Sequence, residues 1–346
     1  MMSNNARGFE HITVNTIKPL NIGIGNFEFH LVTGKLVESG FEQSYSKFKY
    51  ANHLTFLEKN DDWRYFQGIN IIYSPKFIDG FSIGFIRWTQ AYSKFIKENK
   101  DFFPVFDNLF RKNDKYGYQS GSLEGSRDQA AGLNFRWIWK NANAEIYGEY
   151  FHNDSKANIR DLLLDSDHSR AATIGLQKIF SLKNSDDYFK FSWEWTQMEQ
   201  TAGRTLRNQG MWYHHSRVQH GFTNRGEVMG SSIGPGSNSH YFGILKSINK
   251  NKFGIYFEIV DQNNDFLYHA FGEAKDFRRY WKDYNFHFSF KKKLNHYWID
   301  FNAMYSKNLN YQWGLDESKQ GEGWEWYIPG IDIDNFQLNL KIIYFM

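Results

Sequence analysis

The chain has 346 residues, a net charge of +3 at pH 7 and no cysteine. The small net charge argues against a nucleic-acid partner, and the lack of cysteine excludes disulfides and thiolate metal sites. No run of about 18 apolar residues is present, which excludes a transmembrane helix.

Alternating strands dominate the N-terminal half. Aromatic residues make up 19% of the chain, yet the mean hydropathy is −0.64, which is typical of strands whose apolar and polar residues alternate. Residues 33–63 are irregular, and we expect a helical turn or two between Ser46 and Leu57. The alternation predicts strands over residues 9–16, 20–32, 66–74, 81–90, 132–139 and 144–151.

The stretch from Tyr188 to Phe242 organises the rest of the chain. It follows a predicted strand over residues 171–180 and begins with a strand over 188–199. Because successive strand side chains point to opposite faces, Phe189, Phe191, Trp193 and Trp195 form one aromatic face. The opposite face carries Lys190, Ser192, Glu194 and Thr196. The aromatic face therefore has to meet either a protein core or lipid.

A polar connection and a second aromatic segment follow this strand. The connection carries arginines, and Met211–Phe222 is read as a further strand. A glycine-rich passage, residues 226–236, then leads to a strand near Ser239. The C-terminal third alternates most clearly and predicts strands over residues 253–259, 285–290, 297–305 and 335–344.

Strand count and connection lengths predict the architecture. The sequence contains about fourteen candidate strands, many of about 9–11 residues, the length with which a tilted strand crosses a bilayer. Short connections near residues 140–143, 249–251 and 291–295 alternate with long ones. We therefore predict an all-β fold, an antiparallel transmembrane β-barrel of the outer-membrane type. It would form a single domain over residues 1–346, with long extracellular loops near 92–126, 200–236 and 307–331. The alternative is a soluble sandwich or propeller, although no blade-like repeat is visible.

Three sequence motifs lie close together in the middle of the chain: Trp212-Tyr-His-His-Ser-Arg217, His220-Gly-Phe-Thr-Asn-Arg225 and Gly230-Ser-Ser-Ile-Gly-Pro-Gly-Ser-Asn-Ser239. This segment resembles the capsule assembly Wzi family of outer-membrane barrel proteins. Further pieces are similar to the family in the same order, at residues 18–25, 144–149 and 194–198. The resemblance covers most of residues 8–346. It implies a barrel in the bacterial outer membrane that binds or anchors capsular polysaccharide and aids capsule assembly, with lectin-like and not catalytic chemistry.

The resemblance also implies partners and a longer chain. The partners would be surface polysaccharide, outer-membrane lipid and the barrel-insertion machinery. Family members carry an export signal and an eighteen-stranded barrel, whereas Met1–Asn5 lacks the regions of a signal peptide. We therefore expect the chain to be N-terminally incomplete. Outer-membrane barrels usually end on an aromatic residue, and here Tyr344 and Phe345 precede Met346.

The candidate polysaccharide site is the densest polar and aromatic cluster of the sequence. Aromatic faces stack on the apolar surface of sugars, and arginine offers planar multi-donor contacts to the carboxylates of acidic sugars. The alternative is that these residues tie a long loop to the barrel wall. The candidates are Trp212, Tyr213, His214, His215, Arg217, His220, Arg204, Arg207 and Arg225.

Metal and catalytic alternatives have weaker support. Adjacent side chains on a strand diverge, so His214 and His215 do not predict a metal site, and no cofactor is expected. Glu194 and Glu199 would lie on opposite faces, too far apart for a pair of glycosidase acids. Ser169 lacks the sequence of a nucleophile elbow, so we expect no enzyme. The polar face should instead hold an ion network of Arg136, Glu145, Glu149, Glu194 and Glu258.

Two functional hypotheses remain. The first is an outer-membrane protein that binds surface polysaccharide through its extracellular loops. The second is an outer-membrane diffusion channel for small polar solutes. They differ in whether a continuous wet path runs through the lumen.

Overall fold

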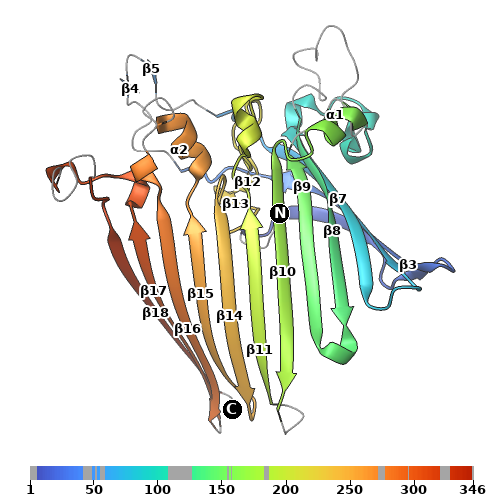
Figure 1. Ribbon diagram of the computed structural model, residues 1–346. Helices are drawn as coiled ribbons and strands as arrows, with labels where there is room; N and C mark the ends of the chain where they lie inside the picture. The colour runs from blue at the N-terminus through green and yellow to red at the C-terminus, as the bar shows by residue number, and fades with distance from the viewer. Residues whose placement is uncertain are drawn as a thin grey trace.

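One curved antiparallel sheet makes up most of the molecule (Figure 1). The computed structural model describes residues 6–41, 49–50, 53–54, 59–107, 127–153, 156, 158–182, 187–271, 277–294, 296–319 and 328–344. Fourteen strands pair almost entirely in chain order, with β2 (Leu20–Asn21) attached to β3. The other strands are, in spatial order, β1 (Glu10–Asn15), β3 (Gly25–Leu36), β6 (Arg64–Pro75), β7 (Phe81–Tyr92), β8 (Asp128–Trp139), β9 (Ala144–Asn153), β10 (Arg170–Ser181), β11 (Tyr188–Gln197), β14 (Asn238–Ile248), β15 (Asn251–Asp261), β16 (Lys282–Leu294), β17 (Tyr297–Leu309) and β18 (Ile333–Tyr344).

Connections of different length gather at opposite ends of the sheet (Figure 1). Hairpins at one end span only a few residues, such as 76–80, 140–143 and 249–250. The other end holds the long connections, among them 37–63 and 198–237. This arrangement confirms the alternation of short and long connections that the sequence predicts.

Short elements lie within the long connections. The helices are α1 (Ile159–Leu164) and α2 (Asn264–Phe271). Two small ladders are formed by β4 (Lys49–Tyr50) with β5 (His53–Leu54) and by β12 (Thr223–Asn224) with β13 (Glu227–Val228). Among the described residues, no helix is long and apolar enough to span a membrane. Single 3-10 turns occur at Ser93–Phe95, Asn99–Phe102, Pro104–Phe106, Lys140–Ala142, Ala202–Thr205, Phe277–Arg279, Tyr311–Trp313 and Glu317–Lys319.

The all-β, antiparallel fold class is confirmed, but three local predictions are wrong. Residues 20–32 form a hairpin and not one strand, because Gly23 turns the chain with φ +87°. The described part of the expected helical region forms the β4–β5 ladder, and the rest of 46–57 lies outside the described residues. Residues 211–222 form turns instead of a strand. In the described part of the chain, β1 and β18 are the end strands of an open sheet.

The outer face of the sheet is apolar across ten strands in register. Each residue of one row pairs directly with the next, and we call this row the outer row. On β18 four alternate apolar side chains are 59–64% exposed. The outer row consists of Phe81, Trp137, Ile146, Leu176, Trp193, Phe242, Phe257, Phe286, Tyr305 and Phe336.

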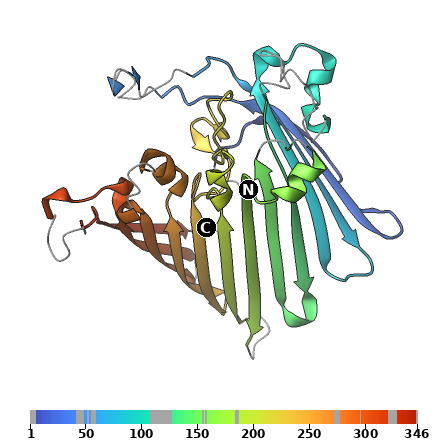
Figure 2. The ribbon, with the colours of Figure 1, turned by 45° about the horizontal axis from the view of Figure 1, so that its top comes forward.

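The opposite face, which we call the inner face, is polar along its middle. A cross-strand row there contains Arg136, Tyr147, Glu194, Tyr241 and Glu258. Near the long-connection end the inner face turns apolar, and the connection of residues 198–237 packs against it (Figure 2). We call residues 198–237 the inner segment. Its core with the sheet comprises Leu36, Phe66, Trp88, Ala130, Phe151, Ala171, Met198, Trp212, Tyr213, Phe222 and Met229.

Candidate functional site

Phe222 is the central apolar anchor of the inner segment. It is fully buried, and its ring stacks on Trp88 of β7 with centroids 4.1 Å apart and an interplanar angle of 19°. On the other side it stacks on Tyr213 at 5.9 Å and 22°. The resulting three-ring stack joins two turns of the inner segment to the sheet.

Gly221 provides a backbone contact that no other residue type would allow. Its φ is +63°, and a Cβ added there would lie 2.1 Å from the carbonyl oxygen of Tyr213. The Gly221 carbonyl oxygen accepts hydrogen bonds from Arg64 Nη1 at 2.7 Å and from Gln90 Nε2 at 3.0 Å. Buried side chains of β6 and β7 therefore bind the backbone of the inner segment directly.

His220 makes two polar contacts beside the Gly221 carbonyl. Its Nε2 lies 3.1 Å from the Glu38 carboxylate, and its Nδ1 lies 2.9 Å from the Tyr92 hydroxyl. Burial, together with the nearby Arg64 charge, lowers the pKa of His220 to about 4, so the imidazole is neutral at pH 7. Because a carboxylate only accepts, Nε2 carries the proton and donates to Glu38, and Nδ1 accepts from Tyr92.

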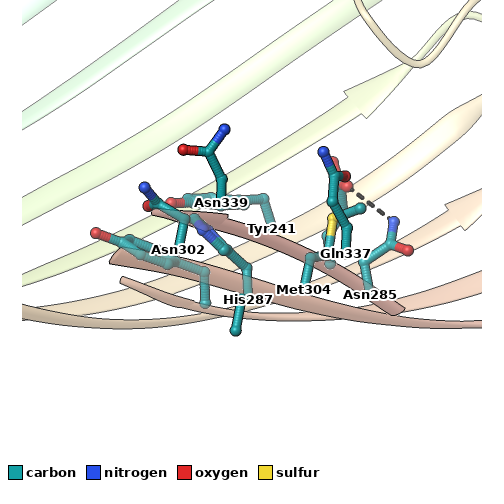
Figure 3. A pocket seen from close by; sticks show the side chains of 10 residues that line it. Tyr241, Asn285, His287, Asn302, Met304, Gln337 and Asn339 are labelled. Carbon is teal, nitrogen blue, oxygen red and sulfur yellow. Dashed lines mark hydrogen bonds between the residues drawn. The ribbon is translucent and has the colours of Figure 1, made fainter. Parts of the chain in front are cut away.

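A second feature is a groove on the inner face of β14–β18. It encloses about 270 Å³, and the side chains labelled in Figure 3 project from adjacent strands to the same side of the sheet. A similar space of about 270 Å³ adjoins it through shared lining residues and reaches Ser231–Ile233 of the inner segment. The groove is lined by Tyr241, Tyr256, Glu258, Asn285, His287, Asn302, Ala303, Met304, Gln337 and Asn339.

Comparison with known proteins decides the family. Residues 1–311 match the family described as capsule assembly protein Wzi. The chain belongs to the Wzi family. Because the match spans most of the chain, it includes the anchoring residues His220, Gly221 and Phe222.

A solved structure of a Wzi protein has a similar fold. It is Wzi of Escherichia coli, described as an outer-membrane protein involved in group 1 capsule assembly and a carbohydrate-binding β-barrel. The TM-score is 0.60 at 11% sequence identity, with 90% of this chain covered. This chain spans about 60% of the length of that protein. No curated protein matches the chain.

Several residues of the Wzi-like motifs at residues 212–225 are buried and hold the inner segment in place. Trp212 and Tyr213 are 1% and 6% exposed, and His220 is 6% exposed, so none of the three offers an open face to a sugar. His215 is also used internally, because its Nδ1 accepts from the backbone amides of Arg217 and Val218. Trp212 lies in the core between the inner segment and the sheet.

The predicted arginines divide into two groups. Arg204 lies over the ring of Tyr268 at 3.5 Å, and Arg207 forms ion pairs with Asp161 at 2.8 Å and Asp165 at 3.3 Å. These two therefore join the inner segment to α2 and α1. Four predicted site residues are exposed: Arg207, despite its ion pairs, and His214, Arg217 and Arg225.

The expected ion network is replaced by separate local pairs. Arg136 forms an ion pair with Glu145 at 2.5 Å. Glu194 instead accepts a hydrogen bond from Tyr147 at 2.6 Å, and Glu258 accepts one from Asn285 at 3.2 Å.

The residues considered for metal binding or catalysis also have defined positions. Ser169 is buried, with φ +54°. The described residues contain no group of three or more His, Asp or Glu side chains placed to hold a metal ion.

The contact between the inner segment and α2 was not predicted from the sequence. Asp265 of α2 is completely buried, and its Oδ1 accepts from the backbone amide of Gln200 at 2.8 Å. Burial, with a smaller contribution from the charge of Glu199, raises the pKa of Asp265 to about 7. Glu199 also accepts from Asn264 and Tyr268 of α2. The only signal in the sequence is an Asn-Asp pair at the start of a short amphipathic helix.

Asp265→Asn is expected to stabilise the protein at pH 8. Because the folded-state pKa is raised, the stabilisation given by the neutral acid is complete below pH 3.8 and is lost as pH rises through about 7. Asparagine keeps the acceptor for Gln200 without the buried charge. The thermal midpoint of Asp265→Asn should exceed that of the wild type by several degrees at pH 8, and much less at pH 5. An equal difference at both pH values would contradict the assignment.

Proposed function

We propose that this chain is part of an outer-membrane β-barrel that binds surface polysaccharide and aids capsule assembly, without catalysis. The observation that carries the proposal is the division of one sheet into two unlike faces. The outer row is apolar across ten strands in register, whereas the inner face is polar. Exposing a Phe or Leu side chain to water costs about 1.5–3 kcal/mol, so such a face suits lipid. Membership of the Wzi family supports the same proposal.

The exposed arginines supply the contact proposed for acidic sugars. Arg217 and Arg225 lie on the inner segment, which connects strands at the long-connection end of the sheet. In outer-membrane barrels the longer loops are extracellular. A guanidinium there would bind the carboxylates of an acidic capsule through paired hydrogen bonds. His214, also exposed, adds a further polar contact.

Retention of polysaccharide at the cell surface tests the proposal. Surface polysaccharide is measured in the cell-bound and medium fractions, with the full-length gene present, deleted, or carrying Arg217→Ala with Arg225→Ala. We expect deletion to move polysaccharide into the medium while total synthesis holds, and the double variant to do so in part. Arg160→Ala, at an exposed arginine of α1, is the matched control. An unchanged partition on deletion would contradict the proposal.

A diffusion channel is the second candidate, favoured by the polar groove on β14–β18. A channel would give discrete conductance steps in planar bilayers. We expect none in the wild type, because the inner segment packs on the inner face of β6–β10 at the long-connection end. Steady conductance of the wild type would favour the channel.

A further inference from the structure

The ring of Tyr256 lies flat against the inner wall of the groove. A Cβ added to Gly243 would meet Tyr256 Cδ1 at 2.8 Å, and one added to Gly254 would meet its hydroxyl at 2.3 Å. Gly243 is the direct cross-strand partner of Tyr256, and Gly254 precedes it by two residues on the same face. Two neighbouring positions without side chains therefore accommodate one ring, whose other side faces the groove.

Two further rings extend this surface. Tyr241 lies 6.0 Å from Tyr256 at an interplanar angle of 20°, and His287 lies 5.2 Å away at 22°. The three residues come from the adjacent strands β14, β15 and β16. They form a nearly parallel aromatic strip, which is the shape needed to stack on the apolar face of a sugar ring.

Amide side chains lie on the β17–β18 side of the aromatic strip. Asn302 and Asn339 are cross-strand partners on β17 and β18, and Gln337 lies on the same face of β18 (Figure 3). An amide offers both a donor and an acceptor, which matches the paired requirements of sugar hydroxyls. Glu258 adds an acceptor, held in place by Asn285.

The charge of the groove selects between classes of sugar. None of the described residues that line it is lysine or arginine, and one, Glu258, is a carboxylate. In the adjoining space Glu194 adds a second carboxylate and Lys190 a cation, so carboxylates outnumber cations among the described lining residues of the two spaces. A uronic acid would meet like charge here, whereas a neutral sugar would not.

We propose that this groove is a second polysaccharide site, which binds a neutral sugar unit on the strip of Tyr241, Tyr256 and His287. It differs from the exposed Arg217 and Arg225 in position and in charge preference. The inference rests on the proposed function, because it assumes that surface polysaccharide is the ligand.

Oligosaccharide binding by the full chain in detergent micelles tests the proposal. The cell's own surface polysaccharide is partly hydrolysed and separated by anion exchange into neutral and acidic pools, and each pool is titrated calorimetrically. For the neutral pool we expect Tyr256→Ala to weaken binding about tenfold, by analogy with other lost aromatic contacts. Tyr256→Phe should bind within about twofold of the wild type, because stacking needs the ring and the Ser289–Tyr256 hydrogen bond is long at 3.4 Å.

Two further variants keep the test decisive if Tyr256→Ala does not fold. The double variant Asn302→Ala with Asn339→Ala should also weaken binding of the neutral pool several-fold. Asn134→Ala is the matched control, an inner-face asparagine of β8 outside the groove, and should leave binding unchanged. Folding of each variant is checked by its heat-dependent mobility in gel electrophoresis.

The outcomes separate this inference from the proposed function. If the wild type binds the neutral pool and neither Tyr256→Ala nor the asparagine pair weakens it, the groove is not the site, although polysaccharide binding stands. Binding of the acidic pool alone, lost in Arg217→Ala with Arg225→Ala, would overturn the groove in the same way. Binding of neither pool would overturn both proposals.

Discussion

Phe222→Ala is expected to lower the free energy of unfolding of the inner segment by about 3–5 kcal/mol, the usual cost of removing a buried phenylalanine. Phe222 lies between the rings of Trp88 and Tyr213, so its loss leaves a cavity bounded by two rigid aromatic groups. The turn that presents the Gly221 carbonyl to Arg64 would lose its support as well. The inner segment should therefore separate from the sheet before the strands unfold.

Chemical denaturation followed by tryptophan fluorescence measures this effect, because Trp88 and Trp212 both lie in the affected core. Phe222→Ala should produce an early transition that the wild type lacks. Phe77→Ala is the control, at a phenylalanine that is 80% exposed in the hairpin between β6 and β7. If both variants unfold like the wild type, Phe222 is not an anchor.

Acidification from about pH 6.5 to 4 is expected to weaken the attachment of the inner segment by about 3 kcal/mol through His220. The folded-state pKa is depressed, so this contribution is complete above pH 6.5 and is lost as pH falls towards 4. Below pH 6.5 the His220 imidazole binds a proton in the unfolded segment but not in the folded one. The proton would have to enter a buried site beside the Arg64 cation.

The other charged groups around His220 change little over this window. Burial acts to raise the pKa of Glu38, but hydrogen bonds from Ser39 and the Lys59 charge lower it on balance, which favours the ionised carboxylate. Tyr92 remains a neutral phenol throughout this range. Arg64 remains cationic, and the charges of Lys59 and Asp62 also act on His220.

Limited proteolysis between pH 7 and 4 measures how far the inner segment detaches from the sheet. Cleavage within residues 198–237 should increase steadily in the wild type as the pH falls. His220→Gln keeps a polar side chain but cannot take up the proton, so its cleavage should be almost independent of pH, although higher at pH 7. A wild-type profile that is flat down to pH 4 would show that His220 does not control the attachment.

Much of the fold follows from the sequence alone. Strand side chains alternate with a strict period of two, so the pattern around Trp193 and along residues 335–344 determines which residues share a face. The lengths of the connections likewise determine which end of the sheet holds the loops. These are local properties, and the structure confirms them with small shifts in strand ends.

Only the tertiary structure decided what the motif at residues 212–225 does. Trp212, Tyr213 and His220 read equally well as an open sugar platform or as an anchor, because their local sequence is the same in both cases. The partners that decide between these readings, such as Trp88 and Glu38, are more than 120 residues away in the sequence. The groove was missed for a related reason: Tyr256 lies flat only because cross-strand pairing places it over Gly243. Burial and register depend on contacts between distant segments, and no local pattern encodes them.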